Sequence, residues 1–176
     1  MFNFEKNHEI TDNNMSESII IRPIKKNDDL AIAKIIRATL EKFSSNLEGT
    51  AYYDKETDKM FSAYADDKSC YYIALFNDDI VGGCGINRLE GASPDICELQ
   101  KMYISPEARG KKIGKQLILK SLEFAKVSGY KKCYLETFPN MTAAIKLYKT
   151  NGFRTIDKPL GNTSHFSCDV WMLKEL

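Results

Sequence analysis

The stretch ELQKMYISPEARGKKIGKQLI, residues 98–118, decides how the chain is expected to fold. Up to Ile104, alternate positions share a character, and this period of two predicts a strand. From Lys112 the apolar residues recur at the spacing of an amphipathic helix. Backbone amides at a helix start lack intrahelical partners and carry the positive end of the helix dipole. The turn over residues 105–111 is therefore predicted to bind an anion such as a phosphate or pyrophosphate.

Basic and small residues in this turn favour the same kind of ligand, because glycine lets a ligand approach the backbone closely. The basic residues are Arg109, Lys111, Lys112 and Lys115, and the glycines are Gly110 and Gly114. A Walker P-loop is excluded, because the two glycines are separated by one residue too few and Gln116 replaces the magnesium-binding hydroxyl. A Rossmann fingerprint at residues 83–85 is excluded because Arg88 replaces its third glycine and a strand continues there.

The segments before this stretch predict a strand, two helices and an antiparallel meander. In order, they are a strand over residues 19–23, a helix from Asn27 or Asp28, a helix over 54–64, and strands over 71–76, 80–88 and 96–104. The apolar side of the first helix is predicted to carry Leu30, Ala33, Ile36, Leu40 and Phe43. Asn77, Asp78 and Asp79 suit a tight hairpin turn. The glycines at positions 82, 83 and 85 are interpreted as a bulge.

The segments after the basic turn predict a crossover back to the sheet. The central helix carries Ile113, Leu117, Leu122 and Ala125 on one side and is expected to end near Ser128. A strand over residues 132–137 then implies parallel pairing with the strand over 96–104. A helix over 142–151 and strands over 153–156 and 168–173 follow. The predicted fold is α/β, a mixed and mostly antiparallel twisted sheet with helices on both faces, splayed open where the two parallel strands diverge.

Length and composition predict one domain. A chain of 176 residues with 43% hydrophobic content can build one sizeable core. We expect residues 19–176 to form this domain and the polar residues 1–18 to be a flexible extension. The formal net charge of +1 gives no general electrostatic reason to bind nucleic acid or an acidic membrane surface.

The five cysteines are expected to be buried, reduced thiols. Their number is odd and no two of them have the spacing of metal ligands, so we expect neither disulfides nor a metal site. They are Cys70, Cys84, Cys97, Cys133 and Cys168. No apolar run approaches the roughly 20 residues that span a bilayer, and the first residues do not form a signal peptide. These features favour a cytoplasmic protein.

The central stretch, together with LETFPNMTAAIKLYKTNGF at residues 135–153, resembles the acyl-coenzyme A binding core of the GNAT superfamily of N-acetyltransferases. The superfamily's turn pattern, Gln/Arg-x-x-Gly-x-Gly/Ala, falls on residues 109–114, with Lys112 at the first glycine position. A non-glycine with ordinary helical angles can still donate its amide there. The resemblance implies a GNAT-like fold and acetyl-coenzyme A as co-substrate. The cofactor contacts that it implies are Met102, Tyr103, Ile104, Arg109, Gly110, Lys111, Lys112, Ile113, Gly114 and Lys115.

The resemblance also implies two catalytic groups for acetyl transfer to a primary amine by direct attack, a reaction that needs a neutral amine and a protonated leaving thiol. Glu98, expected on the strand face that carries Gln100 and Met102, would assist removal of the ammonium proton. Its alternative role is that of a structural carboxylate. Tyr148 would protonate the thiolate, since a phenol of pKa about 10 remains protonated at neutral pH. A core aromatic is the alternative for Tyr148.

Two connections flank the acceptor pocket by the same resemblance. The first contributes Tyr52, Tyr53 and Asp54, and the second contributes Asn162 and His165, although simple solvent exposure is the alternative for each residue. His165 is also an alternative candidate for the base. The acceptor is expected to be a small-molecule or peptide amine, and a homodimer is compatible with the sequence. A non-catalytic acyl-coenzyme A sensor and a transferase of longer acyl groups are the alternative functions.

Overall fold

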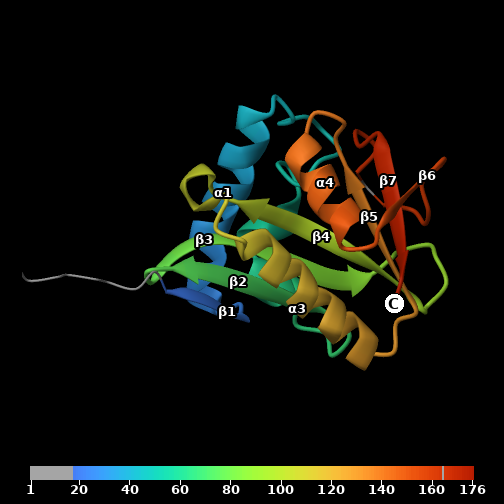
Figure 1. The fold of residues 1–176 in the computed structure, drawn as a ribbon, viewed down its shortest axis with the longest axis horizontal. Helices are drawn as coiled ribbons and strands as arrows, with labels where there is room; N and C mark the ends of the chain where they lie inside the picture. The colour runs from blue at the N-terminus through green and yellow to red at the C-terminus, as the bar shows by residue number, and fades with distance from the viewer. Residues whose placement is uncertain (1–17, 164) are drawn as a thin grey trace, which may run out of the picture.

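The computed structural model describes residues 18–163 and 165–176, and a seven-stranded sheet forms their centre (Figure 1). The strands are β1 Ile19–Pro23, β2 Cys70–Phe76, β3 Asp79–Arg88, β4 Ile96–Ile104, β5 Lys132–Thr137, β6 Arg154–Ile156 and β7 Val170–Glu175. The helices are α1 Asp29–Lys42, α2 Met60–Ala63, α3 Ile113–Val127 and α4 Thr142–Thr150, with 3-10 turns at Lys26–Asp28, Lys55–Asp58 and Pro106–Ala108. The extension expected over residues 1–18 lies outside the described residues, apart from Ser18.

The sheet has the order β1-β2-β3-β4-β5-β7-β6, and β4 and β5 are its parallel neighbours while the other pairs are antiparallel. The parallel pairing runs from Ile96 opposite Lys132 to Glu98 opposite Tyr134. Beyond this point β4 continues to Ile104 and β5 continues to Thr137, so the two strands diverge. The predicted mixed sheet and its opening between these strands are confirmed.

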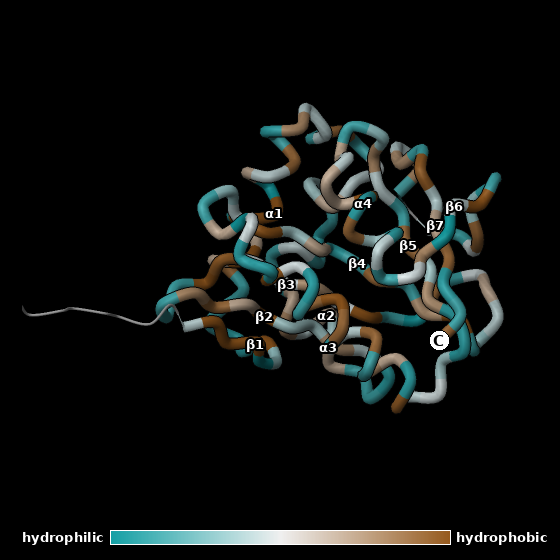
Figure 2. The backbone as a smooth tube through the Cα atoms, in the orientation of Figure 1, coloured by the Kyte–Doolittle hydropathy of each residue, from teal (hydrophilic) through white to brown (hydrophobic). Residues whose placement is uncertain are grey.

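Helices cover both faces of the sheet. The face that carries α3 holds the larger core cluster, which includes Ile113, Leu117, Leu122 and Ala125 from the predicted stripe. On the opposite face, α1 lies against β3 and β4, and its buried side chains form a second cluster with residues of α2 and β2. In Figure 1, α3 lies in front of β2 and β3 while α1 lies behind the sheet. The hydropathy colouring in Figure 2 places apolar segments along the strands and hydrophilic ones mainly in the connections.

Two details of the first helical region differ from the prediction. Residues 54–64 do not form one helix, because Lys59 takes a non-helical conformation (φ −140°, ψ 42°) between the 3-10 turn and the short α2. Leu30 is 68% exposed rather than buried. The buried stripe of α1 is centred on Ile32, Ile36 and Leu40, and this orientation turns Leu30 to solvent.

The hairpin between β2 and β3 forms as predicted, and both Asn77 (φ 49°) and Asp78 (φ 69°) adopt the left-handed conformation typical of such turns. The β2–β3 register shifts next to Gly82, which pairs with Ala74 while Ile80 pairs with Leu75. The glycines of β3 also have a packing role. A Cβ atom at Gly83 would lie 2.4 Å from the ring of Tyr71. The rings of Tyr64 and Tyr71 would obstruct a Cβ at Gly85 in the same way. These aromatic side chains lie directly against the β3 backbone.

The cysteines are free thiols, and all are buried except the partly exposed Cys70. Burial raises the pKa of the Cys84 thiol to about 12, which keeps it protonated and chemically inert. Among residues 18–163 and 165–176, no helix combines the length and the apolar character that crossing a bilayer would require.

Candidate active site

The centre of the candidate site is a bulge in β4 at Lys101. Lys101 has a left-handed φ of 49°, and the register with β3 skips from Gly85 opposite Gln100 to Gly83 opposite Tyr103. The buried hydroxyl of Tyr71 donates a hydrogen bond of 2.8 Å to the carbonyl of Lys101 and fixes this geometry. The extra residue reverses the alternation of side chains after the bulge.

One sequence prediction is wrong for this reason. Met102 packs with the α3 cluster, as Ile104 does, whereas Glu98 and Gln100 lie on the opposite face before the bulge, where Tyr64 contacts Gln100. The expected shared face of Glu98, Gln100 and Met102 assumed an uninterrupted strand. Glu98, the proposed base, therefore lies on one face of β4, whereas Met102 and Ile104 after the bulge lie on the face that carries α3.

Glu98 is a buried carboxyl group with one fixed partner. Its side chain is 4% exposed, and Gln100 Nε2 donates a 2.6 Å hydrogen bond to its Oε2 atom. Tyr64 orients Gln100 in turn through a 2.9 Å bond to Oε1. Burial raises the pKa of Glu98 above its usual value, despite the opposing hydrogen bond from Gln100. A buried carboxylate of raised pKa is suited to accept a proton.

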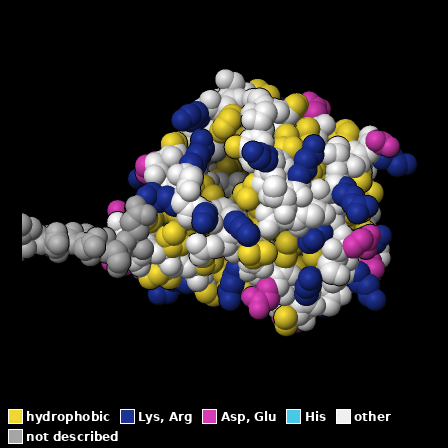
Figure 3. All heavy atoms as spheres, viewed as in Figure 1, with side chains coloured by type: hydrophobic (Ala, Val, Ile, Leu, Met, Phe, Trp, Pro, Cys, Tyr) yellow, Lys and Arg dark blue, Asp and Glu magenta, His cyan; other side chains and the backbone are white. Residues whose placement is uncertain are grey.

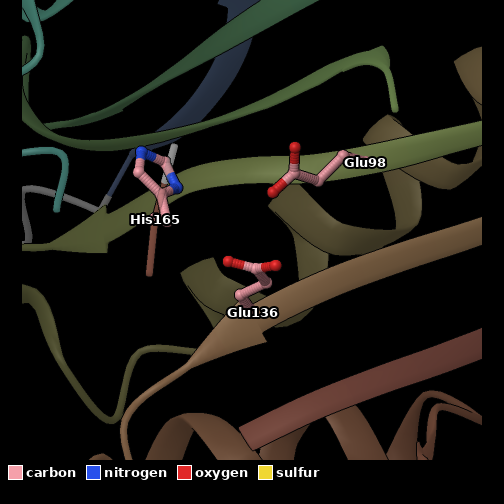
Figure 4. Close-up of side chains that lie close together, drawn as sticks. All are labelled: Glu98, Glu136 and His165. Atoms are coloured by element: carbon pink, nitrogen blue, oxygen red, sulfur yellow. The ribbon is translucent and has the colours of Figure 1, made fainter. Parts of the chain in front are cut away.

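A second glutamate faces Glu98 across the opening between the strands. Glu136 extends from β5, and its Oε1 atom accepts hydrogen bonds from Tyr134 (2.7 Å) and Thr163 (2.9 Å). Its Oε2 atom is buried and has no hydrogen-bond partner among the described residues. Figure 4 shows Glu98 and Glu136 on neighbouring strands, with the ring of His165 directed toward them. One ligand atom from each of these three residues lies within 4.8 Å of the others, close enough to share one cation.

Beside the two glutamates, two cationic groups share one carboxylate. Asp54 Oδ2 lies 2.7 Å from Lys101 Nζ and 3.0 Å from His165 Nε2. Burial would raise the pKa of Asp54, but the contacts with His165 and Lys101 outweigh burial and lower it to about 2. Burial would likewise lower the pKa of His165, but Asp54 outweighs it and raises this pKa overall. His165 therefore tends to be protonated beside an ionised Asp54.

The pocket between β4, β5 and α4 contains both predicted catalytic residues. Glu98 lines it from β4 and Tyr148 from α4. The Tyr148 side chain is buried, with its ring 6.0 Å from the ring of Phe153 in an edge-to-face contact. Burial raises the pKa of Tyr148, so its phenol keeps its proton and can act as a hydrogen-bond donor or proton donor.

The basic turn lies between β4 and α3, as predicted. Gly110 has a φ of 81°, and a Cβ atom there would find no atom within 4 Å, so this part of the backbone is open to a ligand. Arg109 Nε donates to the carbonyl of Ile104 at 3.3 Å, and its guanidinium lies 5.6 Å from the Phe43 ring centre. In Figure 3, Lys and Arg side chains surround a hollow near the end of β4 on this face of the molecule.

Lys112 does not have the ordinary helical angles that the sequence interpretation assumed. It precedes α3 in the left-handed conformation, with φ 62° and ψ 10°. Glycine takes this conformation without the steric cost of a Cβ atom, which gives a physical reason for the glycine of the family pattern. The lysine side chain is exposed and can remain in solvent while its amide stays at the helix start.

The turn suits the pyrophosphate of coenzyme A. The first amides of the 15-residue helix α3 have no intrahelical acceptors, and the neighbouring side chains are basic. Gly114 lets the helix approach its neighbours, because a Cβ there would lie 2.8 Å from Leu147 and 3.1 Å from Ile104. This close packing brings the start of α3 to the pocket that Tyr148 lines.

The residues expected to bind the acceptor are only partly brought together. Of the five, His165 lines the pocket, and the other four are absent from its described lining. Tyr52 donates to Glu41 at 2.7 Å, Tyr53 is 60% exposed, and the Asn162 amide donates to the carbonyl of Glu90 at 2.7 Å.

Sequence reasoning missed two polar residues of the site, Lys101 and Glu136, as functional candidates, and named Asp54 only as part of a connection that flanks the acceptor pocket. A signal existed for Lys101, because strict alternation would place it between Leu99 and Tyr103 on an apolar strand face. A lysine in such a position can indicate a bulge. Glu136 had no comparable local signal, since its role depends on contacts across the fold.

Comparison with known proteins agrees with this geometry. The model of the Acetyltransferase (GNAT) family matches residues 33–153, which include the basic turn and both proposed catalytic residues. The chain therefore belongs to the GNAT family and is an N-acetyltransferase, a class of enzyme that uses acyl-coenzyme A.

Individual relatives agree with the family assignment. The chain is 39% identical over 161 residues to the uncharacterized N-acetyltransferase YjgM of Escherichia coli, covering 91% of this chain and 96% of that protein. A GNAT acetyltransferase structure from Staphylococcus aureus has a TM-score of 0.74 at 20% identity, covering 90% of this chain and 99% of that one. The PaiA N-acetyltransferase of Thermoplasma acidophilum, solved with coenzyme A, has a TM-score of 0.64 at 20% identity, with 90% and 99% covered.

Proposed function

We propose that this N-acetyltransferase transfers the acetyl group of acetyl-coenzyme A to a primary amine by direct attack. The observation that carries the proposal is that Glu98 and Tyr148 line one pocket at the opening between β4 and β5. Glu98 on β4 can thus accept a proton, and Tyr148 on α4 can donate one, in the same pocket. Amide formation needs both groups.

The cofactor would be held by two parts of the chain. The turn and helix start over residues 109–115 would hold the pyrophosphate, through amides at the N-terminus of α3 and through basic side chains. The backbone of residues 102–104 lies on β4 beyond its last pairing with β5, so this edge of the strand is available to the pantetheine arm. Acetyl-coenzyme A would supply the thioester carbonyl whose C–S bond breaks as the new C–N bond forms.

Glu98 and Tyr148 would move the two protons of the reaction. Glu98 accepts a proton from the ammonium group, directly or through water, and leaves a neutral nucleophile. Its raised pKa matches this task better than that of an exposed carboxyl group. Tyr148 donates its hydroxyl proton toward the departing sulfur. The edge-to-face contact with Phe153 holds the Tyr148 ring in position for this step.

The reaction is tested by measuring thiol release from acetyl-coenzyme A over a panel of primary amines, with Glu98→Gln and Tyr148→Phe beside the parent. We expect each variant to lose about 10²-fold or more in kcat/KM, a typical effect of removing a general acid or base. Acetyl-coenzyme A binding, measured by calorimetry, should be unchanged in both. Tight cofactor binding without turnover on any amine would instead support a non-catalytic sensor.

The cofactor site has a separate test. Arg109→Glu should weaken acetyl-coenzyme A binding at least tenfold, because it places a negative charge beside the pyrophosphate. Lys126→Glu is a suitable control, since Lys126 is exposed near the opposite end of α3. Equal affinities of the two variants and the parent would contradict the phosphate assignment.

A further inference from the structure

The polar lining of the pocket is divided into an anionic and a cationic wall. Glu98 and Glu136 form the first, and Lys101 and His165 form the second. Asp54, which pairs with both cationic groups, is not among the described residues that line the pocket. A ligand in the pocket meets Lys101 and His165 rather than the carboxylate between them.

The cationic wall keeps a positive charge after its internal pairing. Asp54 supplies one negative charge to Lys101 and to a protonated His165, so the three groups together retain a charge of one. The raised pKa of His165 supports its protonated form. Lys101 Nζ cannot turn away into solvent, because its side chain is 3% exposed. The wall therefore has the charge that a carboxylate ligand needs.

In the anionic wall, one carboxylate oxygen of Glu136 lacks a hydrogen-bond donor within the described part of the chain, and a ligand could supply one. Glu136 Oε2 is buried without a hydrogen-bond partner among the described residues, and a carboxylate oxygen in that state is strongly unfavourable. An ammonium group carries three N–H donors and could contact Glu98 and Glu136 at once. A cation alone would leave Lys101 without an anionic ligand, whereas an acceptor with both charges would match both walls.

The spacing of the walls limits the length of this acceptor. Ligand atoms of Glu98, Glu136 and His165 all lie within 4.8 Å of one another, so the two charges of the acceptor must also lie close together. An amine and a carboxylate on one carbon atom meet this condition. A long diamine would place its second ammonium group against the positive wall or outside the pocket.

We propose that the acceptor is a free α-amino acid, with its ammonium group between Glu98 and Glu136 and its carboxylate at Lys101 and His165. This inference rests on the proposed acetyl transfer and assigns two further roles. Glu136 is a substrate-binding residue for the amine, and Lys101 is the specificity-determining residue for the carboxylate. Asp54 is a positioning residue, which acts on the acceptor only through Lys101 and His165.

The test compares each of the twenty standard amino acids with its α-carboxamide, which keeps the amine and removes the negative charge. Binding is measured by calorimetry on the protein saturated with coenzyme A, and turnover is measured separately with acetyl-coenzyme A. We expect at least one amino acid to bind and react at least tenfold better than its carboxamide. Lys101→Met should reduce the preference for the acid over its carboxamide to less than threefold. If that variant does not fold, the comparison of acids with carboxamides on the parent protein still tests the inference.

Glu136→Gln tests the amine end. It should weaken amino acid binding at least tenfold and leave acetyl-coenzyme A binding unchanged, while Glu123→Gln on the exposed side of α3 should change neither. The inference is overturned if no amino acid binds, or if carboxamides bind and react as well as the acids. Amino acid binding without turnover would support the amino acid binding site while contradicting acetyl transfer, so the two failures are distinguishable.

Discussion

The carboxylate of Asp54 lies 2.7 Å from the ammonium group of Lys101, and this pair connects the loop after α1 to the bulge in the central strand. The contact holds a lysine that is almost completely buried and whose backbone is in the left-handed region. His165 adds a second contact to the same carboxylate at 3.0 Å. Asp54 therefore contributes both to the stability of the fold and to the charge of the pocket.

Asp54→Asn is expected to destabilise the protein by about 2 kcal/mol at pH 7, the value that corresponds to a pKa lowered from 3.8 to about 2. Because the folded-state pKa is lowered, this stabilisation is complete above pH 3.8 and is lost as the pH falls toward 2. Urea unfolding of parent and variant should show their difference shrinking in this window. The exposed Asp169→Asn serves as a control, and a difference that did not change with pH would contradict the ion-pair explanation.

The acidic limb of the pH–rate profile should report the ionisation of the Glu98 carboxyl group. Burial raises its pKa, so kcat/KM should rise with pH as the carboxyl group loses its proton, at a higher pH than for an ordinary glutamate. In Glu98→Gln the same limb should disappear, together with about 10²-fold of the rate. An amine of low pKa is needed, so that ionisation of the acceptor does not mask the profile. An unchanged limb in Glu98→Gln would assign it to another group.

Lys112→Gly should be more stable than Lys112→Ala by about 0.5–1 kcal/mol, because only glycine adopts a φ of 62° without a steric penalty. Chemical denaturation of the two variants measures this difference directly. Both substitutions remove the same positive charge, so their cofactor affinities should fall by a similar factor. Equal stabilities would indicate that Lys112 does not have the left-handed conformation in solution.

Gly83→Ala should cost about 3 kcal/mol of stability, near the upper end of overpacking effects, because the new methyl group would collide with the Tyr71 ring and with a backbone carbonyl. Gly129→Ala is the comparison, since a Cβ there meets no atom within 4 Å and only its φ of 86° is unfavourable. That change should cost about 1 kcal/mol. Thermal unfolding of the two variants tests the order, and a similar loss in both would contradict close contact at Gly83.

Much of the fold was predictable because its elements have strong periodic patterns. The period of two up to Ile104 and the helical period from Lys112 located β4 and α3, and their succession implied the parallel crossover. The failures come from single residues. The bulge at Lys101 involves the hydroxyl of Tyr71 and a register shift against β3, and its one local signal is a lysine on an otherwise apolar strand face.

The site was predictable only where short motifs mark it. Glu98 and Tyr148 were predicted from the resemblance of their segments to the family's motifs, and both line one pocket in the structure. Glu136 and Asp54 lie in segments with no distinctive pattern, and their importance comes from partners distant in sequence, such as Thr163 and Lys101. Electrostatic pairing across a fold cannot be read from local spacing.

The early divergence of β4 and β5 has a practical consequence for enzyme engineering. Glu98 on β4 and Tyr148 on α4 are the groups proposed for transfer. Asp54 and His165 lie instead in connections between elements, the first before α2 and the second before β7. Because Asp54 and His165 contact each other and Asp54 contacts Lys101, an exchange of these connections must keep both residues, while the other loop positions are open to change. Redesign of the acceptor site can therefore vary the rest of these two loops while Lys101 on β4 and Glu136 on β5 stay in place.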